Sequence, residues 1–387
     1  MKGNRTTGIL IILIAYITTG MLGVYLSVFQ YTIFPVAQLF NLNIAFMGVL
    51  IGVQSFGMLI APLILGGQNN RIGKRKVLLV SYLLLVAGTI FAGVTFELAA
   101  YIIAVFIIGA GYSVTEATIA AVLADEFPDK AVRHLSFSQT VFSAGALLGP
   151  VMAEGLIKHG VFFKDLYTYI GIVFILLGGV FGLIRQKNDA GARSTVSSGN
   201  IIYLLRNRAF VLLAFSLLIY IGAETVIAGF MDGYFELVVN TPENSAIALS
   251  LFWGAMIPSR FLVGVINLEG KKMMAASLAI TVFAIVGGMV APWHTAKLAM
   301  FALCGFGCGP QWPLLMNEAA KRNPGSSGME MNTMVAFGSL GAVLFPLLAG
   351  FLADASSAVA AYYFCAVAVL VILILVFRYF LGEKRAS

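Results

Sequence analysis

The chain has 387 residues, of which 60% are hydrophobic and 11% charged, and its net charge is +7. The mean hydropathy is +0.95. An ordinary soluble domain carries about 25% charged residues, so this composition excludes a water-soluble globular protein. Irregular backbone cannot face lipid, so the sequence predicts an all-α integral membrane protein.

Twelve apolar segments are long enough to cross a bilayer, which takes about 20 residues each. They are expected at 8–34, 44–67, 76–96, 98–124, 135–157, 167–184, 210–234, 245–268, 273–291, 297–319, 328–352 and 359–380. The first segment is too long for the apolar region of a signal peptide and lacks a convincing cleavage site. We therefore expect it to remain as the first transmembrane helix.

The basic residues are divided unequally between the two sides of these segments. Of the 24 Lys and Arg residues, 20 lie at the two termini or in connections on the same side as the termini. The exceptions are Lys158, Lys164, Lys297 and Arg260. Because cytoplasmic loops carry an excess of Lys and Arg, both termini are predicted in the cytoplasm and the chain in the inner cell membrane. The asymmetry also accounts for the positive net charge, so a nucleic acid partner is not expected.

Two segments contain a carboxyl group among apolar neighbours, Glu116 in 98–124 and Glu224 in 210–234. A charge at the centre of a bilayer costs about 2.5–3.5 kcal/mol on insertion scales, so such a residue usually has a function. We predict that both carboxyl groups take part in proton coupling. The alternatives are a structural hydrogen bond from Glu116 to a neighbouring helix, and an anchoring role for Glu224 between the seventh and eleventh helices.

The longest polar connection, 185–209, is rich in Gly, Ser, Arg and Asn. It predicts a cytoplasmic linker between an N-terminal six-helix bundle, 1–184, and a C-terminal bundle, 210–387. A regulatory role is the alternative to a plain linker. Residues 201–205, IIYLL, are expected to form a short amphipathic helix at the membrane surface.

The two bundles share a sequence repeat with an offset of 196 residues. Gly109, Gly111 and Pro128 recur as Gly305, Gly307 and Pro324, and the pattern Ser143-x-Gly145-Ala146-x-Leu148-x-Pro150 recurs from Ser339 to Pro346. This duplication predicts twelve helices in two six-helix bundles related by a pseudo-two-fold axis, with a substrate site at the repeat interface. Glu116 corresponds to Trp312 and Gln139 to Val335, so the repeat keeps its small residues and loses these polar groups.

Amide and aromatic side chains within the helices are candidates for binding a polar substrate, because a buried amide in a membrane must find a partner. The candidates are Gln139, Tyr31, Gln30, Tyr112 and Gln54 in the first half, and Trp253, Gln311, Trp312 and Asn332 in the second. We expect Gln139 to act with Glu116, and Gln311 with Trp312. Any single Tyr or Trp can instead be a packing residue.

The sequence indicates neither an enzyme nor a cofactor. His134, His159 and His294 are expected on separate loops, and the three cysteines lie within helices, so no catalytic group and no metal site is predicted. A Gly-x-x-x-x-Gly-Lys-Ser/Thr loop for ATP is also missing from the sequence.

The connection between the second and third segments reads Gly66-Gly67-Gln68-Asn69-Asn70-Arg71-Ile72-Gly73-Lys74-Arg75-Lys76. It resembles the signature G-x-x-x-D-R-x-G-R-[RK] of the major facilitator superfamily, with Asn70 in the aspartate position. A degenerate copy runs from Gly264 to Lys272, preceded by Arg260. The resemblance implies a conformational latch at Gly66, Asn70, Arg71, Gly73, Lys74, Arg75 and Arg260, which the loss of the aspartate weakens. Arg260 is expected to reach the cytoplasm or to pair with a loop carboxylate.

Within that superfamily the sequence resembles the fucose:proton symporters and related sugar porters. The stretch 133–146, RHLSFSQTVFSAGA, is similar to their fifth helix, where Gln139 would contact sugar, and Glu116 matches a glutamate of their fourth helix. The run from Tyr220 to Glu224 also resembles these relatives. Tyr31, ahead of Pro35, replaces their carboxylate in the first helix. An Asn-Pro pair is also absent after Glu116, which puts fucose itself in doubt.

The resemblance implies a monomeric secondary transporter that works by alternating access and takes up a sugar or a similar small polar metabolite together with protons. A proton-driven exporter of drugs or amphipathic metabolites is the alternative. It is favoured by the pattern Gly145-x-x-x-Gly149-Pro150-x-x-Ala153-Glu154, which partly matches the antiporter motif of drug exporters.

Overall fold

The computed structural model describes residues 2–65, 73–126, 131–183, 201–265, 270–322 and 327–383. Within these ranges the chain forms helices and short connections, without strands. Twelve of the helical segments are long and apolar enough to cross a membrane. The predicted all-α membrane fold with twelve spans is therefore confirmed.

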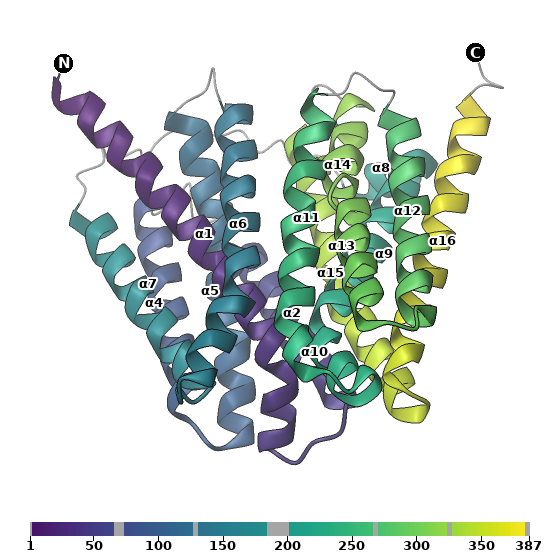
Figure 1. Cartoon of the computed structure of the whole chain (residues 1–387). Coiled ribbons are helices and arrows are strands. Elements are labelled where there is room, and N and C mark those ends of the chain that lie inside the picture. The colour runs from purple at the N-terminus through teal and green to yellow at the C-terminus, as the bar shows by residue number, and fades with distance from the viewer. Residues whose placement is uncertain are drawn as a thin grey trace. The chain divides into compact units, whose positions relative to one another are not determined.

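The first half of the chain runs from purple to teal in Figure 1. Its helices are α1 (Lys2–Leu39), α2 (Ala45–Leu65), α4 (Lys74–Val94), α5 (Leu98–Glu126), α6 (Ala131–Lys158) and α7 (Asp165–Leu183). Pro35, Pro62 and Pro150 lie inside α1, α2 and α6. A proline removes one backbone hydrogen bond, which neighbouring helices of a membrane bundle can compensate.

The second half begins with a short helix, α8 (Ile201–Arg206), which confirms the helix expected at 201–205. It continues with α9 (Arg208–Gly229), α10 (Met231–Tyr234), a π-helix (Phe235–Val239), a 3₁₀ turn (Pro242–Asn244), α11 (Ser245–Val265), α12 (Gly270–Val290), α13 (His294–Cys308), α14 (Gln311–Arg322), α15 (Ser327–Ala355) and α16 (Ala358–Glu383). The Asn207 side chain caps α9 by accepting from the amide of Ala209 at 3.0 Å.

Two predicted helices are interrupted, which corrects the sequence prediction. The helix expected at 210–234 breaks at Phe230, between Gly229 and Gly233, because glycine has a low helix propensity. The helix expected at 297–319 divides into α13 and α14 at Gly309 and Pro310. Pro310 has no N–H to continue the helix.

By its internal contacts the chain divides into two units. Unit 1 comprises residues 1–32 and 53–194, and unit 2 comprises residues 33–52 and 195–387. The last turns of α1 and the first turns of α2 are thus counted with the second half of the chain. The domain boundaries proposed at residues 184 and 210 remain predictions.

The 196-residue repeat reappears as equivalent helix contacts inside each unit. A Cβ atom added to Gly111 in α5 would lie 2.7 Å from the Leu85 amide nitrogen and 3.0 Å from the Ser81 carbonyl oxygen of α4. A Cβ atom on Gly307 in α13 would lie 2.9 Å from the amide nitrogen of Thr281 and 2.8 Å from the carbonyl oxygen of Ser277 in α12. The four contacted residues are themselves 196 positions apart in pairs. Small residues allow helix backbones to approach closely in lipid, so the repeat preserves a packing geometry.

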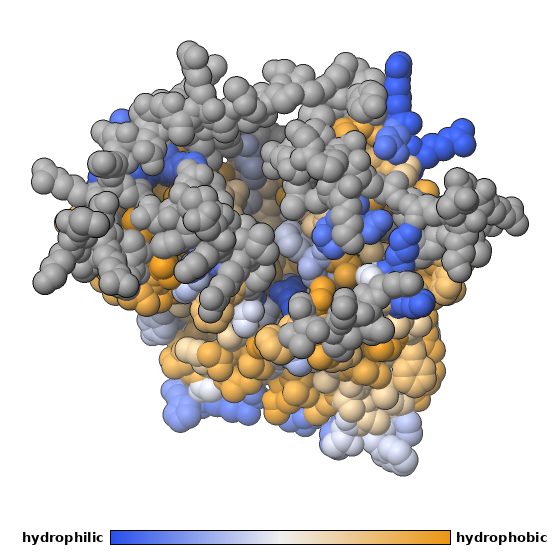
Figure 2. All heavy atoms as spheres, turned by 90° about the horizontal axis from the view of Figure 1, so that it is seen from above, coloured by the Kyte–Doolittle hydropathy of each residue, from blue (hydrophilic) through white to orange (hydrophobic). Residues whose placement is uncertain are grey.

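Large apolar side chains lie exposed on the outward faces of the helices. Leu83, Phe261 and Val367 are 68%, 69% and 62% exposed. Figure 2 shows mostly hydrophobic residues on the visible flank of the described helices. Such a surface suits contact with lipid tails.

Candidate functional site

The candidate site in unit 1 is centred on Glu116 of α5 and Gln139 of α6. The Gln139 Nε2 atom donates to the Glu116 Oε1 atom at 3.5 Å, and both side chains are half-buried. Tyr112 precedes Glu116 by one turn and is 5% exposed. Its phenol is within electrostatic range of the Glu116 carboxyl. The structure thus brings together three of the residues predicted from the sequence.

A second polar pair extends this site toward α1 and α2. The Gln54 Nε2 atom donates to the Tyr25 hydroxyl at 2.6 Å, and the two side chains are 2% and 0% exposed. The Tyr25 ring lies 6.2 Å from the ring of Tyr112, measured between centroids. Buried polar groups in a membrane protein need partners, and each member of this pair satisfies the other. Through Tyr25, Gln54 therefore joins Tyr112 in one polar cluster.

Three further residues of this cluster were not predicted from the sequence. The Thr32 hydroxyl lies 2.6 Å from the Tyr167 hydroxyl, and the Tyr101 hydroxyl donates to Tyr167 at 3.3 Å. Tyr101 and Tyr167 stand in the first turns of α5 and α7, where tyrosines usually mark the membrane interface. A tyrosine in the first turn of a helix gives no sequence signal of burial, and only the tertiary contacts place these two inside.

The two remaining candidates of the first half are neighbours on α1. Gln30 is 4% exposed and Tyr31 is half-buried, within two turns of Tyr25. His134 and His294 correct a further expectation, because they lie in α6 and α13 instead of on loops. The His134 Nδ1 atom is 2.6 Å from the Tyr16 hydroxyl.

In unit 2 the candidate carboxyl group is Glu224 of α9. The Tyr220 hydroxyl donates to the Glu224 Oε1 atom at 2.8 Å, one turn away on the same helix. The guanidinium of Arg260 in α11 lies within electrostatic range of this carboxyl, and its Nη2 atom is 3.6 Å from the Met256 sulfur. Glu224 therefore shares its surroundings with a cation and a phenol.

Gln311 makes a contact between helices. Its Nε2 atom donates to the Ser277 hydroxyl at 2.5 Å and to the Met274 carbonyl oxygen at 3.2 Å, both in α12. The repeat contains the same contact, since Thr115 donates to the Ser81 hydroxyl at 2.8 Å. An interaction present in both halves indicates a structural role, and substrate binding by Gln311 remains an untested prediction.

The two tryptophan candidates of the second half differ in their exposed fraction. Trp253 is 4% exposed and packs edge-on against Phe252, whereas Trp312 is 36% exposed. Asn332 belongs to α15, and its side chain lies outside the described residues.

The predicted latch is described only in part, because Gly66, Asn70 and Arg71 lie outside the described residues. Gly73 has a positive φ of 88°, which a glycine adopts without strain, and Lys74 begins α4. The Arg75 Nη2 atom donates to the Gly182 carbonyl oxygen at 2.5 Å, which joins the start of α4 to the end of α7.

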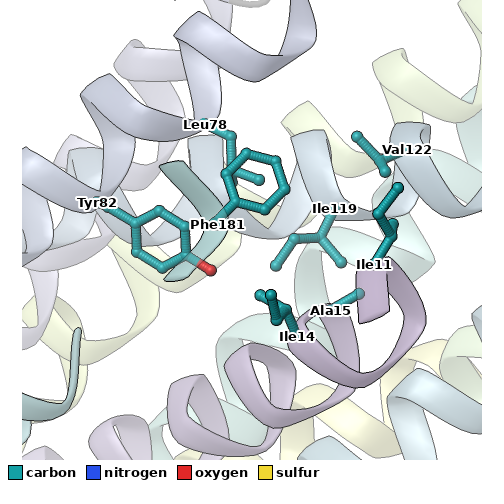
Figure 3. Close-up of a pocket in the computed structure, with 8 residues that line it drawn as sticks. All are labelled: Ile11, Ile14, Ala15, Leu78, Tyr82, Ile119, Val122 and Phe181. Carbon is teal, nitrogen blue, oxygen red and sulfur yellow. The ribbon is translucent and has the colours of Figure 1, made fainter. Parts of the chain in front are cut away.

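A small pocket in unit 1 is lined by other residues than those of the polar cluster (Figure 3). Its lining residues are Ile11, Ile14, Ala15, Leu78, Tyr82, Ile119, Val122 and Phe181. The Tyr82 hydroxyl is the polar atom drawn in this view, and it bonds the Thr18 hydroxyl at 2.5 Å. An apolar lining of this kind offers few groups to orient a polar ligand.

A comparison with family models matches the Major Facilitator Superfamily over residues 8–269 and 267–387. The chain belongs to the Major Facilitator Superfamily. It is therefore a multi-pass membrane protein and a secondary transporter of a small molecule, and not an enzyme.

Relatives within the superfamily include sugar transporters. The glucose/mannose transporter GlcP of Bacillus subtilis is 24% identical over 280 residues, which cover 68% of this chain and 67% of GlcP. A glucose/galactose transporter of Brucella abortus is 22% identical over 246 residues, which cover 59% of this chain and 58% of that protein. The chain thus matches a little over half of the length of the Brucella relative.

Solved structures of superfamily members share the fold at low sequence identity. A structure of the nucleoside transporter NupG matches with a TM-score of 0.79 and 13% identity, covering 97% of this chain and 100% of NupG. The E. coli fucose:proton symporter FucP matches with a TM-score of 0.66 and 18% identity, covering 94% of this chain and 99% of FucP. These likenesses support the fold and leave the substrate to be inferred from the site.

Proposed function

We propose that this transporter takes up a sugar or a similar small polar metabolite together with protons, by alternating access. The observation that carries the proposal is the half-buried Glu116 carboxyl beside the amide of Gln139, with 3.5 Å between them. The proposal includes a monomer in the inner cell membrane. Both termini are placed in the cytoplasm, as the distribution of Lys and Arg predicts.

The composition of the unit 1 cluster suits a ligand with several hydroxyl groups. Amides both donate and accept hydrogen bonds, so Gln139 and Gln54 can each form a hydrogen bond with a hydroxyl group of the ligand. The rings of Tyr25 and Tyr112, 6.2 Å apart and buried in this structure, would offer apolar faces to the C–H surfaces of a sugar once alternating access opens the site. Sugar transport by GlcP and by the Brucella relative supports the same substrate class.

Glu116 is better suited than Glu224 to bind and release a proton during transport. The Gln139 amide that bonds Glu116 is neutral, so it can accompany either the charged or the neutral carboxyl. Glu224 already has a cation, the guanidinium of Arg260, and a hydrogen-bonding phenol, that of Tyr220, in its surroundings, which suits a structural pairing. We assign proton coupling to Glu116 and a supporting role to Glu224.

Uptake by purified protein in liposomes tests the proposed function. The probes are radiolabelled glucose, mannose, galactose and fucose, with uridine as a nucleoside and ethidium as a lipophilic cation. We expect uptake of at least one sugar to rise several-fold under an inward proton gradient. Sugar uptake that ignores the gradient would contradict proton coupling, and transport of uridine or ethidium alone would contradict the substrate class.

A further inference from the structure

The last turns of α1 and the first turns of α2 form a hairpin that is packed as part of unit 2. Residues 33–52 are counted with that unit, whereas the chain up to Thr32 and from Val53 to Ser194 is counted with unit 1. We call residues 33–52 the hairpin end. It lies at the opposite end of α1 from the N-terminus, which is the outer side in the proposed orientation. Alternating access moves the two halves, so the hairpin end must change its contacts or move with one half.

The hairpin end packs closely against α15. A Cβ atom added to Gly48 in α2 would collide with the carbonyl oxygen of Pro346 in α15. A Cβ atom added to Gly350 in α15 would lie 2.6 Å from the carbonyl oxygen of Ala45 in α2. Each glycine thus meets the backbone of the other helix, an approach that small residues allow in a membrane. We call these two contacts the glycine seam.

A hydrogen bond between two exposed side chains continues the line of the glycine seam. The Asn43 Nδ2 atom donates to the Asp354 Oδ2 atom at 2.9 Å. Asn43 lies in the connection from α1 to α2, and Asp354 lies one turn beyond Gly350 in α15. A hydrogen bond to a charged group is strong, but water can replace it at an exposed position. This pair can therefore both hold the hairpin end and release it.

The hairpin end also contacts the interruption between α9 and α10. A Cβ atom added to Gly233 would lie 3.2 Å from the Phe34 ring and 3.4 Å from the Met47 sulfur. A Cβ atom added to Gly229 would lie 2.5 Å from the Ile51 side chain. Met47 and Ile51 are 0% and 2% exposed. The hairpin end is thus docked on unit 2 by backbone contacts, by apolar side chains and by a polar pair.

Both boundaries of the hairpin end carry a residue that weakens a helix. Pro35 in α1 has no N–H to donate to the carbonyl oxygen of Tyr31, one turn before it. Gly52 is the last residue of the hairpin end in α2, and glycine has a low helix propensity. Sharp bends in helices occur mostly at proline. The two helices can therefore bend where the hairpin end begins and ends.

We propose that the hairpin end is an outer gate of the transporter, closed by docking on α15 and on the interruption between α9 and α10, and latched by Asn43 and Asp354. The inference rests on the proposed alternating access and adds the residues of the gate. Opening breaks the hydrogen bond of the latch, separates the glycine seam and exposes Met47.

The first experiment cross-links the latch. The variant with both Asn43→Cys and Asp354→Cys is joined by a short bis-methanethiosulfonate, which dithiothreitol removes. We expect exchange of labelled for unlabelled glucose in liposomes to fall tenfold or more after cross-linking and to recover after reduction. The two single variants, treated with the same reagent, are the controls and should change less than twofold.

The second experiment needs no substrate, because it follows labelling of Met47→Cys by a maleimide that cannot cross the membrane. Gly350→Ala crowds the glycine seam and should make this labelling tenfold faster or more. Gly155→Ala, whose Cβ would have nothing within 4 Å, is the control and should stay within twofold. Gly350→Ala without the added cysteine reveals any unfolding, because the native cysteines are buried.

Two results would overturn the gate. Glucose exchange at the unmodified rate in the cross-linked variant would show that the hairpin end stays docked throughout transport. Equal labelling of Met47→Cys with and without Gly350→Ala would show that the glycine seam does not hold the gate closed. A protein that labels as expected but transports none of the sugars would contradict the proposed function and still support the gate.

Discussion

The two carboxyl groups within the helices, Glu116 and Glu224, differ in the side chains that surround them. Glu116 and Glu224 look equivalent in sequence, since each lies in an apolar helix. The structure separates them, because Glu116 meets an amide at 3.5 Å whereas Glu224 meets a phenol at 2.8 Å within reach of Arg260. The pair of Glu116 and Gln139 was predicted from a family resemblance, while the surroundings of Glu224 depend on tertiary contacts that one sequence does not reveal.

Gln139→Ala should weaken substrate binding. Loss of one hydrogen bond to a bound hydroxyl group costs about 0.5–1.5 kcal/mol, which corresponds to up to about a tenfold rise in Kd. Gln311→Ala is the matched control, because its amide bonds Ser277 and Met274 instead. We expect that control to lower the melting temperature and to leave the Kd unchanged. Titration with glucose by calorimetry measures the Kd of each variant, and thermal unfolding measures its melting temperature. A larger rise of the Kd in Gln311→Ala than in Gln139→Ala would contradict the assignment.

Burial of Lys164 should make the free energy of unfolding depend on pH in the alkaline range. Its side chain is 0% exposed, and burial lowers the pKa of this lysine below its usual value of 10.5. Between the lowered pKa and 10.5, the unfolded chain binds a proton that the folded protein does not, so stability should rise with pH in that window. Lys164→Met should remove this increase. Thermal unfolding in detergent from pH 8 to pH 11 tests it, and identical slopes for both proteins would count against the prediction.

At the scale of helices, closely packed glycines determine which elements touch. The repeat was visible in the sequence as Gly111 and Gly307, but their function as contacts with α4 and α12 required the structure. Hydropathy located the spans but could not show the interruptions at Phe230 and at Gly309, since it averages over a whole span. The Gly309-Pro310 pair was the available signal for the second break.

Gly111→Ala and Gly307→Ala should destabilise the protein to a similar extent. In both positions a Cβ atom would lie 2.7–3.0 Å from backbone atoms of the neighbouring helix, so the helices must separate. Overpacking of this kind costs about 1–3 kcal/mol. Gly155→Ala in α6 is the control, because its Cβ would have nothing within 4 Å. Melting temperatures in detergent provide the measurement, and a drop for Gly155→Ala as large as for the other two would refute the packing argument.

At the scale of the molecule, the fold was the most predictable property. Long apolar segments can hardly be anything but helices in lipid, and the repeat fixed their number at twelve, as found. The candidate site was less predictable, because its side chains Tyr25, Gln54, Tyr112, Glu116 and Gln139 come from α1, α2, α5 and α6. Thr32, Tyr101 and Tyr167 are far apart in sequence and resemble ordinary interfacial or packing residues until the helices are assembled.

The central claim is that Glu116 couples substrate movement to protons, and glucose-driven proton entry into liposomes tests it most directly. Glu116→Gln keeps the shape and hydrogen-bonding capacity of the side chain but cannot ionise, and Glu224→Gln is its matched control in the other half. We predict that Glu116→Gln exchanges glucose but brings in no protons, and that Glu224→Gln retains glucose-driven proton entry. Proton entry that persists in Glu116→Gln at the unmodified rate would contradict the account.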